Sequence, residues 1–121
     1  MSVNVSVPVN TDVTSLAIAN SDNNFQRVTI EWDNGNGPTD TYTTTSVPPY
    51  DNVEFGGATR NSGSSGVIKV TVEHSSNGTT NWQASEMRLK ELSPSGEAEV
   101  QSNEDDPPPE PWDDTIAKFT W

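Results

Sequence analysis

The residues best suited to chemistry in this sequence are the carboxylates between Glu104 and Asp114. Six of the 18 acidic residues fall in this short segment, and no lysine or arginine lies among them. Carboxylates packed this closely repel one another, which raises their pKa values unless a cation or solvent relieves the repulsion. Ca²⁺ takes six to eight oxygen ligands, many of them carboxylates from one loop. The segment therefore predicts an oxygen-ligand metal site, with a solvated acidic linker as the alternative.

The prolines of the same segment narrow the kind of site. Four of them lie between Pro107 and Pro111, and because proline fixes φ and lacks a backbone N–H, the segment cannot be a helix. An EF-hand is excluded, since the spacing of its loop is absent and its flanking helix cannot form. Zinc is disfavoured because the chain has no cysteine and one histidine.

Catalysis finds little support elsewhere in the chain. The one histidine, His74, ends an alternating segment and precedes two serines, and a Ser-His-Asp triad needs a geometry that spacing does not indicate. Two carboxylates across a glycosidic bond would make a glycosidase, yet consecutive acids on a proline-rich loop hold a fixed gap poorly. We expect a protein that is not an enzyme, with an acid-based glycosidase as the enzyme-class alternative.

Composition and charge restrict the partners. The net charge of −12 disfavours nucleic acid, whose phosphates would be repelled, and disfavours anionic membrane surfaces for the same reason. No stretch has the roughly 20 apolar residues of a membrane span. The N-terminal residues alternate and lack the basic start and apolar run of a signal peptide. The localisation thus stays open between the cytoplasm and a non-classical export route.

The rest of the chain has the pattern of a β-sandwich. Apolar residues alternate with polar ones in short segments, as in Val3–Val9 and around Leu16 and Ile18. Turn-forming residues separate these segments, and they predict turns at 33–38 and 61–66. No longer repeat is visible. We predict a single all-β domain over residues 1–121, an antiparallel sandwich of about nine strands. The side chains expected to share its core are Val28, Ile30, Ile68, Val70, Val72 and Leu89.

Four stretches of the sequence, taken in order, resemble the LecB (PA-IIL) family of small bacterial lectins. They are Val7–Thr11 with Ala17–Ser21, Asn61–Gly66 with the strand after it, Ala84–Leu92, and the acidic segment with its continuation to Trp121. Together they cover nearly the whole chain. The family binds fucose and mannose through calcium, so the resemblance implies a nine-stranded LecB-like lectin fold and a carbohydrate ligand.

The resemblance also implies which residues form the site. In the family, two adjacent calcium ions coordinate sugar hydroxyls, which are hard, neutral oxygen donors suited to calcium. The positions that match metal ligands, directly or after a local shift, are Asn20, Asp105, Asp106, Glu110, Asp113 and Asp114. The positions implied to contact sugar are Ser21, Asp22, Asn23, Trp112, Asp113 and Asp114.

The acidic segment departs from the family pattern at Pro109 and Pro111, which stand where the family has aspartates. Each lost carboxylate removes charge and a ligand, so we expect weakened or altered calcium dependence, with at most one ion rather than two. The alternative is a structural or interaction domain whose sugar and calcium site has decayed. The family also implies a homodimer or higher oligomer, which apolar Phe119 and Trp121 near the chain end favour.

Overall fold

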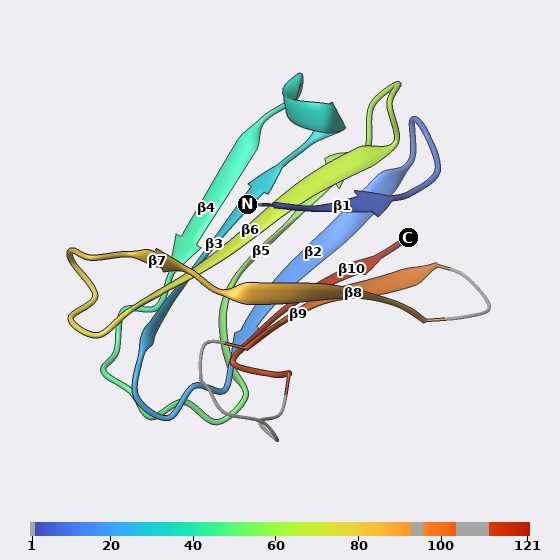
Figure 1. Cartoon of the computed structure of the whole chain (residues 1–121). Helices are drawn as coiled ribbons and strands as arrows, with labels where there is room; N and C mark the ends of the chain where they lie inside the picture. The colour runs from blue at the N-terminus through green and yellow to red at the C-terminus, as the bar shows by residue number, and fades with distance from the viewer. Residues whose placement is uncertain (1, 93–95, 104–111) are drawn as a thin grey trace.

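Two antiparallel sheets pack face to face in the computed structural model, which describes residues 2–92, 96–103 and 112–121. The first sheet has the order β1-β6-β3-β4, with β7 also paired to β6, and the second has the order β5-β2-β10-β9-β8 (Figure 1). The elements are β1 Val3–Ser6, β2 Asp12–Ala19, β3 Phe25–Glu31, η1 Asp33–Gly35, β4 Thr39–Thr43, β5 Val53–Asn61, β6 Val67–Ser75, β7 Gln83–Ala84, β8 Glu86–Leu92, β9 Glu97–Asn103 and β10 Thr115–Thr120. The predicted antiparallel sandwich is confirmed.

The core lies between the sheets and contains most of the residues expected there. Five of the six predicted core side chains have at most 1% of their surface exposed, and they are Val28, Ile30, Ile68, Val70 and Val72. Trp32 and Phe119 are fully buried, with their rings edge-to-face at a centroid distance of 6.3 Å. The prediction for Leu89 is wrong, because this residue is 38% exposed on β8, the edge strand of its sheet.

Strand β2 has the opposite orientation from the one that its large apolar residues suggest. Its buried residues are Val13, Ser15, Ala17 and Ala19, whereas Leu16 and Ile18 on the other face are only partly buried. Phe119 of β10 is paired directly with Ser15, so the small side chain lies beside a bulky one.

The burial of Phe119 also corrects one argument for self-association. Its side chain is fully buried within the protein's own core, and Trp121 packs against that core. Neither residue is therefore an exposed apolar surface that needs a second copy to cover it. The family resemblance is then the remaining support for the predicted oligomer.

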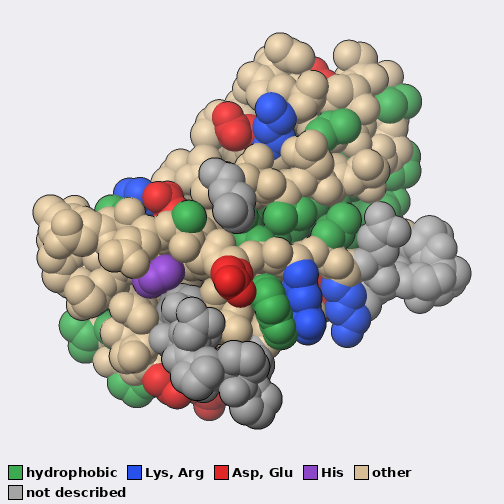
Figure 2. All heavy atoms as spheres, viewed as in Figure 1, with side chains coloured by type: hydrophobic (Ala, Val, Ile, Leu, Met, Phe, Trp, Pro, Cys, Tyr) green, Lys and Arg blue, Asp and Glu red, His purple; other side chains and the backbone are tan. Residues whose placement is uncertain are grey.

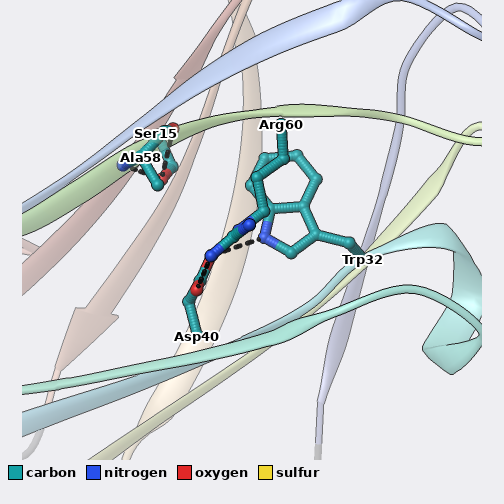
Figure 3. Close-up of polar contacts among 5 residues, drawn as sticks. All are labelled: Ser15, Trp32, Asp40, Ala58 and Arg60. Atoms are coloured by element: carbon teal, nitrogen blue, oxygen red, sulfur yellow. Dashed lines mark hydrogen bonds and ion pairs between the residues drawn. The ribbon is translucent and has the colours of Figure 1, made fainter.

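A polar cluster joins the two sheets along the edge formed by β4 and β5. The carboxylate of Asp40 on β4 accepts hydrogen bonds from Arg60 Nε at 2.6 Å, from the Arg60 terminal nitrogen at 2.7 Å and from Trp32 Nε1 at 2.9 Å. Figure 3 shows these three side chains converging, with Arg60 reaching from β5. Beside them, Ser15 Oγ lies 3.1 Å from both the amide nitrogen and the carbonyl oxygen of Ala58, which ties β2 to β5.

The predicted turns at residues 33–38 and 61–66 lie together at one end of the sandwich. Ser65 donates its backbone N–H to Asp33 Oδ1 at 3.0 Å. Gly63 has a φ of +75°, and a Cβ there would meet the Asp33 carboxylate, so both the backbone conformation and the space require glycine. The single helical turn of the described residues, η1, is also found here, and it is too short to cross a membrane.

Candidate functional site

The predicted site residues are carried by loops at the opposite end of the sandwich. The β2–β3 loop, the β4–β5 loop and the segment leading into β10 all lie at this end, at the bottom of Figure 1. The backbone N–H of Asn20 donates to the carbonyl oxygen of Asp114 at 3.0 Å, and Asp114 donates its own N–H to Ser102 at 3.2 Å. The ladder between β2 and β10, whose last pair is Ala19 with Thr115, is thereby extended by one step. Two candidate metal ligands from distant parts of the chain are therefore adjacent.

Two further candidate residues are coupled by charge across the same junction. Burial raises the pKa of the Asp113 carboxyl, a hydrogen bond from its own backbone opposes this shift, and the negative charge of Asp22 raises the pKa further. Asp22 is exposed on the β2–β3 loop. A cation between the two loops would offset both the repulsion and the burial of the Asp113 charge.

The β2–β3 loop is held from below by the β4–β5 loop. Ser21 is fully buried, and its hydroxyl accepts the N–H of Asn24 at 3.1 Å while its carbonyl accepts the N–H of Tyr50 at 2.9 Å. The side-chain oxygen of Asn20 accepts the N–H of Asn52 at 2.9 Å. These bonds leave Asp22 and Asn23 as the exposed residues of the loop.

A buried polar network lies beneath the site and fixes the strands that lead into it. Thr115 donates its hydroxyl to Gln26 Oε1 at 2.6 Å, which links β10 to β3 across the sandwich. Ser102 Oγ donates to the Thr115 carbonyl at 3.0 Å and accepts the Thr115 N–H at 2.9 Å. The N–H of Gln26 and the hydroxyl of Tyr50 both donate to Thr44 Oγ1, at 3.0 and 2.9 Å. Because buried polar groups are costly when unpaired, this network favours one arrangement of the loops above it.

Trp112 is fixed by a basic residue that sequence reasoning did not select. The guanidinium carbon of Arg88 on β8 lies 4.8 Å from the centre of the Trp112 ring, within the range of a cation–π contact. Arg88 Nε also donates to Gln101 Oε1 at 2.8 Å. Sequence spacing gave no signal for this contact, because it depends on how β8 and the residues before β10 meet in space.

Asn20 is thus brought to Asp114 and Asp22 to Asp113, whereas Trp112 contacts Arg88. The other predicted ligands, Asp105, Asp106 and Glu110, lie outside the described residues, as do Pro109 and Pro111. Among the residues that the structure describes, no group of three or more acidic, histidine or cysteine side chains is close enough to hold a metal. The donors present are oxygens, as calcium requires, so the described residues fit part of a calcium site.

Comparison with known proteins places this geometry in a fold family. No protein-family model matches the sequence, and no curated protein matches it. The Ralstonia solanacearum high-affinity mannose-binding lectin superposes with a TM-score of 0.67 at 28% identity, covering 98% of this chain and 94% of that one. The chain has a LecB-like lectin fold.

Two other lectin structures agree with this assignment. The C-terminal domain of the BC2L-C lectin from Burkholderia cenocepacia has a TM-score of 0.70 at 19% identity, covering 98% of this chain and 93% of its own. The Chromobacterium violaceum lectin CV2L, in complex with alpha-methyl-fucoside, has a TM-score of 0.68 at 22% identity, covering 98% and 94%. At these identities the likeness concerns the fold, and it extends over essentially the whole LecB-like sandwich.

Proposed function

We propose that this protein is a carbohydrate-binding lectin of the fucose and mannose type. Its sugar site is the end of the sandwich where the β2–β3 loop meets the residues before β10. The observation that carries the proposal is the hydrogen bond from Asn20 to Asp114, because it joins the two segments that hold the candidate ligands. Three lectins of the same fold support the choice of ligand, since one is a mannose-binding lectin and another is bound to a fucoside. The expectation that the chain is not an enzyme agrees with them.

Calcium binding is proposed in a weakened form, with one ion at most. The described residues that would hold it are Asn20, through its backbone carbonyl, and the carboxylates of Asp113 and Asp114. When bound, calcium would supply positive charge and open coordination positions for sugar hydroxyls. The raised pKa of Asp113 supports this proposal, since a carboxylate that is costly to ionise beside Asp22 is relieved by a cation.

The exposed loop residues and Trp112 would orient the sugar. The Asp22 carboxylate accepts hydrogen bonds, whereas the Asn23 amide both donates and accepts them. A ligand rich in hydroxyl groups needs acceptors as well as donors in its site. Trp112 offers an apolar ring whose position Arg88 fixes. Ser21 has no exposed surface, so its contribution is to hold the loop in shape.

A glycan-array screen in calcium, repeated with a chelator, tests the proposed function. We expect binding to neutral fucosides or mannosides that weakens when calcium is removed. Binding that is unaffected by the chelator would retain the lectin function and reject the calcium site. No binding to any glycan under either condition would reject the lectin and favour the alternative, a structural or interaction domain with a decayed site.

A further inference from the structure

A hollow at the same end of the sandwich is lined by polar residues, none of which is acidic. It has a volume of about 350 Å³ and is formed where the end of β6, the β6–β7 turn and the start of β3 meet. Pockets for small ligands begin at about 300 Å³. Its lining residues are Asn24, His74, Ser75, Ser76, Asn81 and Gln83. We infer that this pocket binds a neutral sugar residue without a metal ion.

The chemistry of the lining selects the class of ligand. Amides, hydroxyls and an imidazole line the pocket, and none of the six residues is acidic, lysine or arginine. Figure 2 shows that the surface around the β6–β7 turn is also uncharged, since it consists almost wholly of neutral polar side chains and backbone. An anionic ligand finds no cation here and meets a chain with a net charge of −12. Vicinal hydroxyls, which donate and accept at close spacing, match amides that do the same.

Three of the lining side chains are available to a ligand. The side chains of Ser76, Asn81 and Gln83 are exposed and make no hydrogen bond with another described residue. His74 shares its Nδ1 with Ser85 Oγ at 2.8 Å, which leaves the Nε2 atom for a ligand. Whichever tautomer His74 adopts, Nε2 is then a donor or an acceptor.

The walls of the pocket are set in place before any ligand arrives. Ser75 Oγ donates to the Thr80 carbonyl at 2.6 Å, and Asn77 Oδ1 accepts the N–H groups of Thr79 and Thr80 at 3.0 and 2.9 Å. Gly78 packs on the Phe25 ring, where a Cβ would come within 2.8 Å. A turn held by its own bonds loses little entropy on binding, which favours affinity.

The far wall is fixed by strand pairing. His74 is paired with Gln26 on one side and with Gln83 on the other, so the three side chains share one face of the sheet. Gln26 is fully buried and donates from Nε2 to the Asn24 carbonyl at 3.2 Å. The chain crosses to the second sheet at Ser85, whose N–H donates to the Val72 carbonyl at 3.0 Å. His74 and Gln83 are therefore presented to the pocket by ladder geometry and not by a mobile loop.

Trp82 lies beside the pocket and stabilises one of its flanking segments. Its ring lies under the guanidinium of Arg27, 4.3 Å from the ring centre, and Arg27 Nε is bonded to Glu73 at 3.0 Å. The Trp82 ring is not part of the pocket lining. Because β7 is paired with β6 and β6 with β3, the Trp82–Arg27 contact spans β6 and ties the segment between Asn81 and Gln83 to a side chain of β3.

The test is a titration of the isotopically labelled full chain with sugars in the presence of a chelator, monitored by NMR through the amide chemical shifts. The probes are mannose, fucose, galactose, glucose and N-acetylglucosamine, each added to millimolar concentration. We expect saturable shifts at residues 74–76 and 81–83 for at least one sugar. Gln83→Ala should weaken that binding by roughly 2- to 10-fold, the effect of one lost hydrogen bond.

Two further variants separate this pocket from the proposed calcium-linked site. Thr79→Ala changes an exposed residue of the same turn outside the lining and should leave the affinity unchanged. Asp113→Asn should also leave it unchanged, although it impairs the other site. The inference is overturned if no sugar gives saturable shifts at 74–83, or if Asp113→Asn, titrated in calcium, removes them along with those at residues 20–23.

Discussion

Asn20 and Asp114, at the ends of two neighbouring strands, are joined by a 3.0 Å hydrogen bond between their main chains. The bond continues the β2–β10 ladder into the loops, so the β2–β3 loop and the residues before β10 are positioned by the most regular part of the fold. A binding site on loops gains precision when rigid strands hold them. This is why the predicted ligands, although far apart in the sequence, meet in the folded chain.

Thr115→Val should destabilise the protein by about 0.5–1.5 kcal/mol, because the buried Gln26 Oε1 loses the hydrogen bond from the Thr115 hydroxyl. Thr120→Val changes an exposed residue at the end of the same strand and should have little effect. Urea unfolding monitored by tryptophan fluorescence measures both. Equal stabilities for the two variants would contradict the role given to the buried network.

Asp40→Ala should destabilise the protein by about 1–3 kcal/mol at neutral pH, since the buried Trp32 N–H loses its acceptor. Asp12→Ala, at an exposed position, is the control. Unfolding free energies from urea titrations of both variants give the comparison. A loss of stability no larger than that of the control would show that the Asp40 cluster does not stabilise the contact between the sheets.

The stability due to Asp40 should also depend on pH. The hydrogen bond from Arg60 holds the pKa of the Asp40 carboxyl below its usual value, the bond from Trp32 acts in the same direction, and burial opposes them. The unfolded chain then binds this proton more tightly than the folded one, so the contribution is complete above the unfolded pKa of about 3.9 and is lost as the pH falls through the lower folded value. The difference in unfolding free energy between wild type and Asp40→Asn should accordingly shrink below about pH 4. A difference that is constant from neutral pH to pH 2 would contradict this account.

Arg88→Ala should weaken sugar binding by roughly 2- to 5-fold, because a cation–π contact at a partly exposed site is worth about 0.5–1 kcal/mol and holds the Trp112 ring in place. Lys90→Ala is the matched control, an exposed basic residue two positions further along the same strand. Titration calorimetry with the best glycan of the array compares them. An identical affinity for both variants would show that sugar binding does not depend on Arg88 holding the Trp112 ring.

Calcium should stabilise the wild-type protein by about 2–3 kcal/mol at a hundredfold excess over its Kd, since it binds the folded chain. Asp114→Ala should remove most of this effect, and Asp12→Ala should preserve it. Thermal unfolding with calcium and with a chelator provides the measurement. If millimolar calcium leaves the melting temperature unchanged, the replacement of two family aspartates by Pro109 and Pro111 has abolished calcium binding.

The sequence was sufficient for the parts of the fold that local periodicity controls. Alternation placed Val28, Ile30 and Val72 in the core, and turn composition placed the bends at 33–38 and 61–66. It failed where the partner strand decides the outcome. On β2 the small residues face inward beside Phe119, and on edge strand β8 the same apolar parity leaves Leu89 exposed.

The candidate site divides in the same way. Resemblance selected Asn20, Asp113 and Asp114, which the fold brings together. The resemblance also placed Asp22 and Asp113 in one site, but their electrostatic coupling and the Arg88–Trp112 contact depend on how distant segments meet, which the sequence does not indicate. The ligands between Asp105 and Glu110 lie outside the described residues and stay predictions.

The central claim is that this end of the sandwich binds sugar through its acidic residues. Titration calorimetry of the best-binding fucoside or mannoside, with wild type and Asp113→Asn in calcium and in chelator, tests it most directly. We predict that wild type loses affinity in chelator by at least about tenfold, which is 1.4 kcal/mol, and that Asp113→Asn binds weakly under both conditions. Equal affinities of wild type and Asp113→Asn, unchanged by the chelator, would contradict the account.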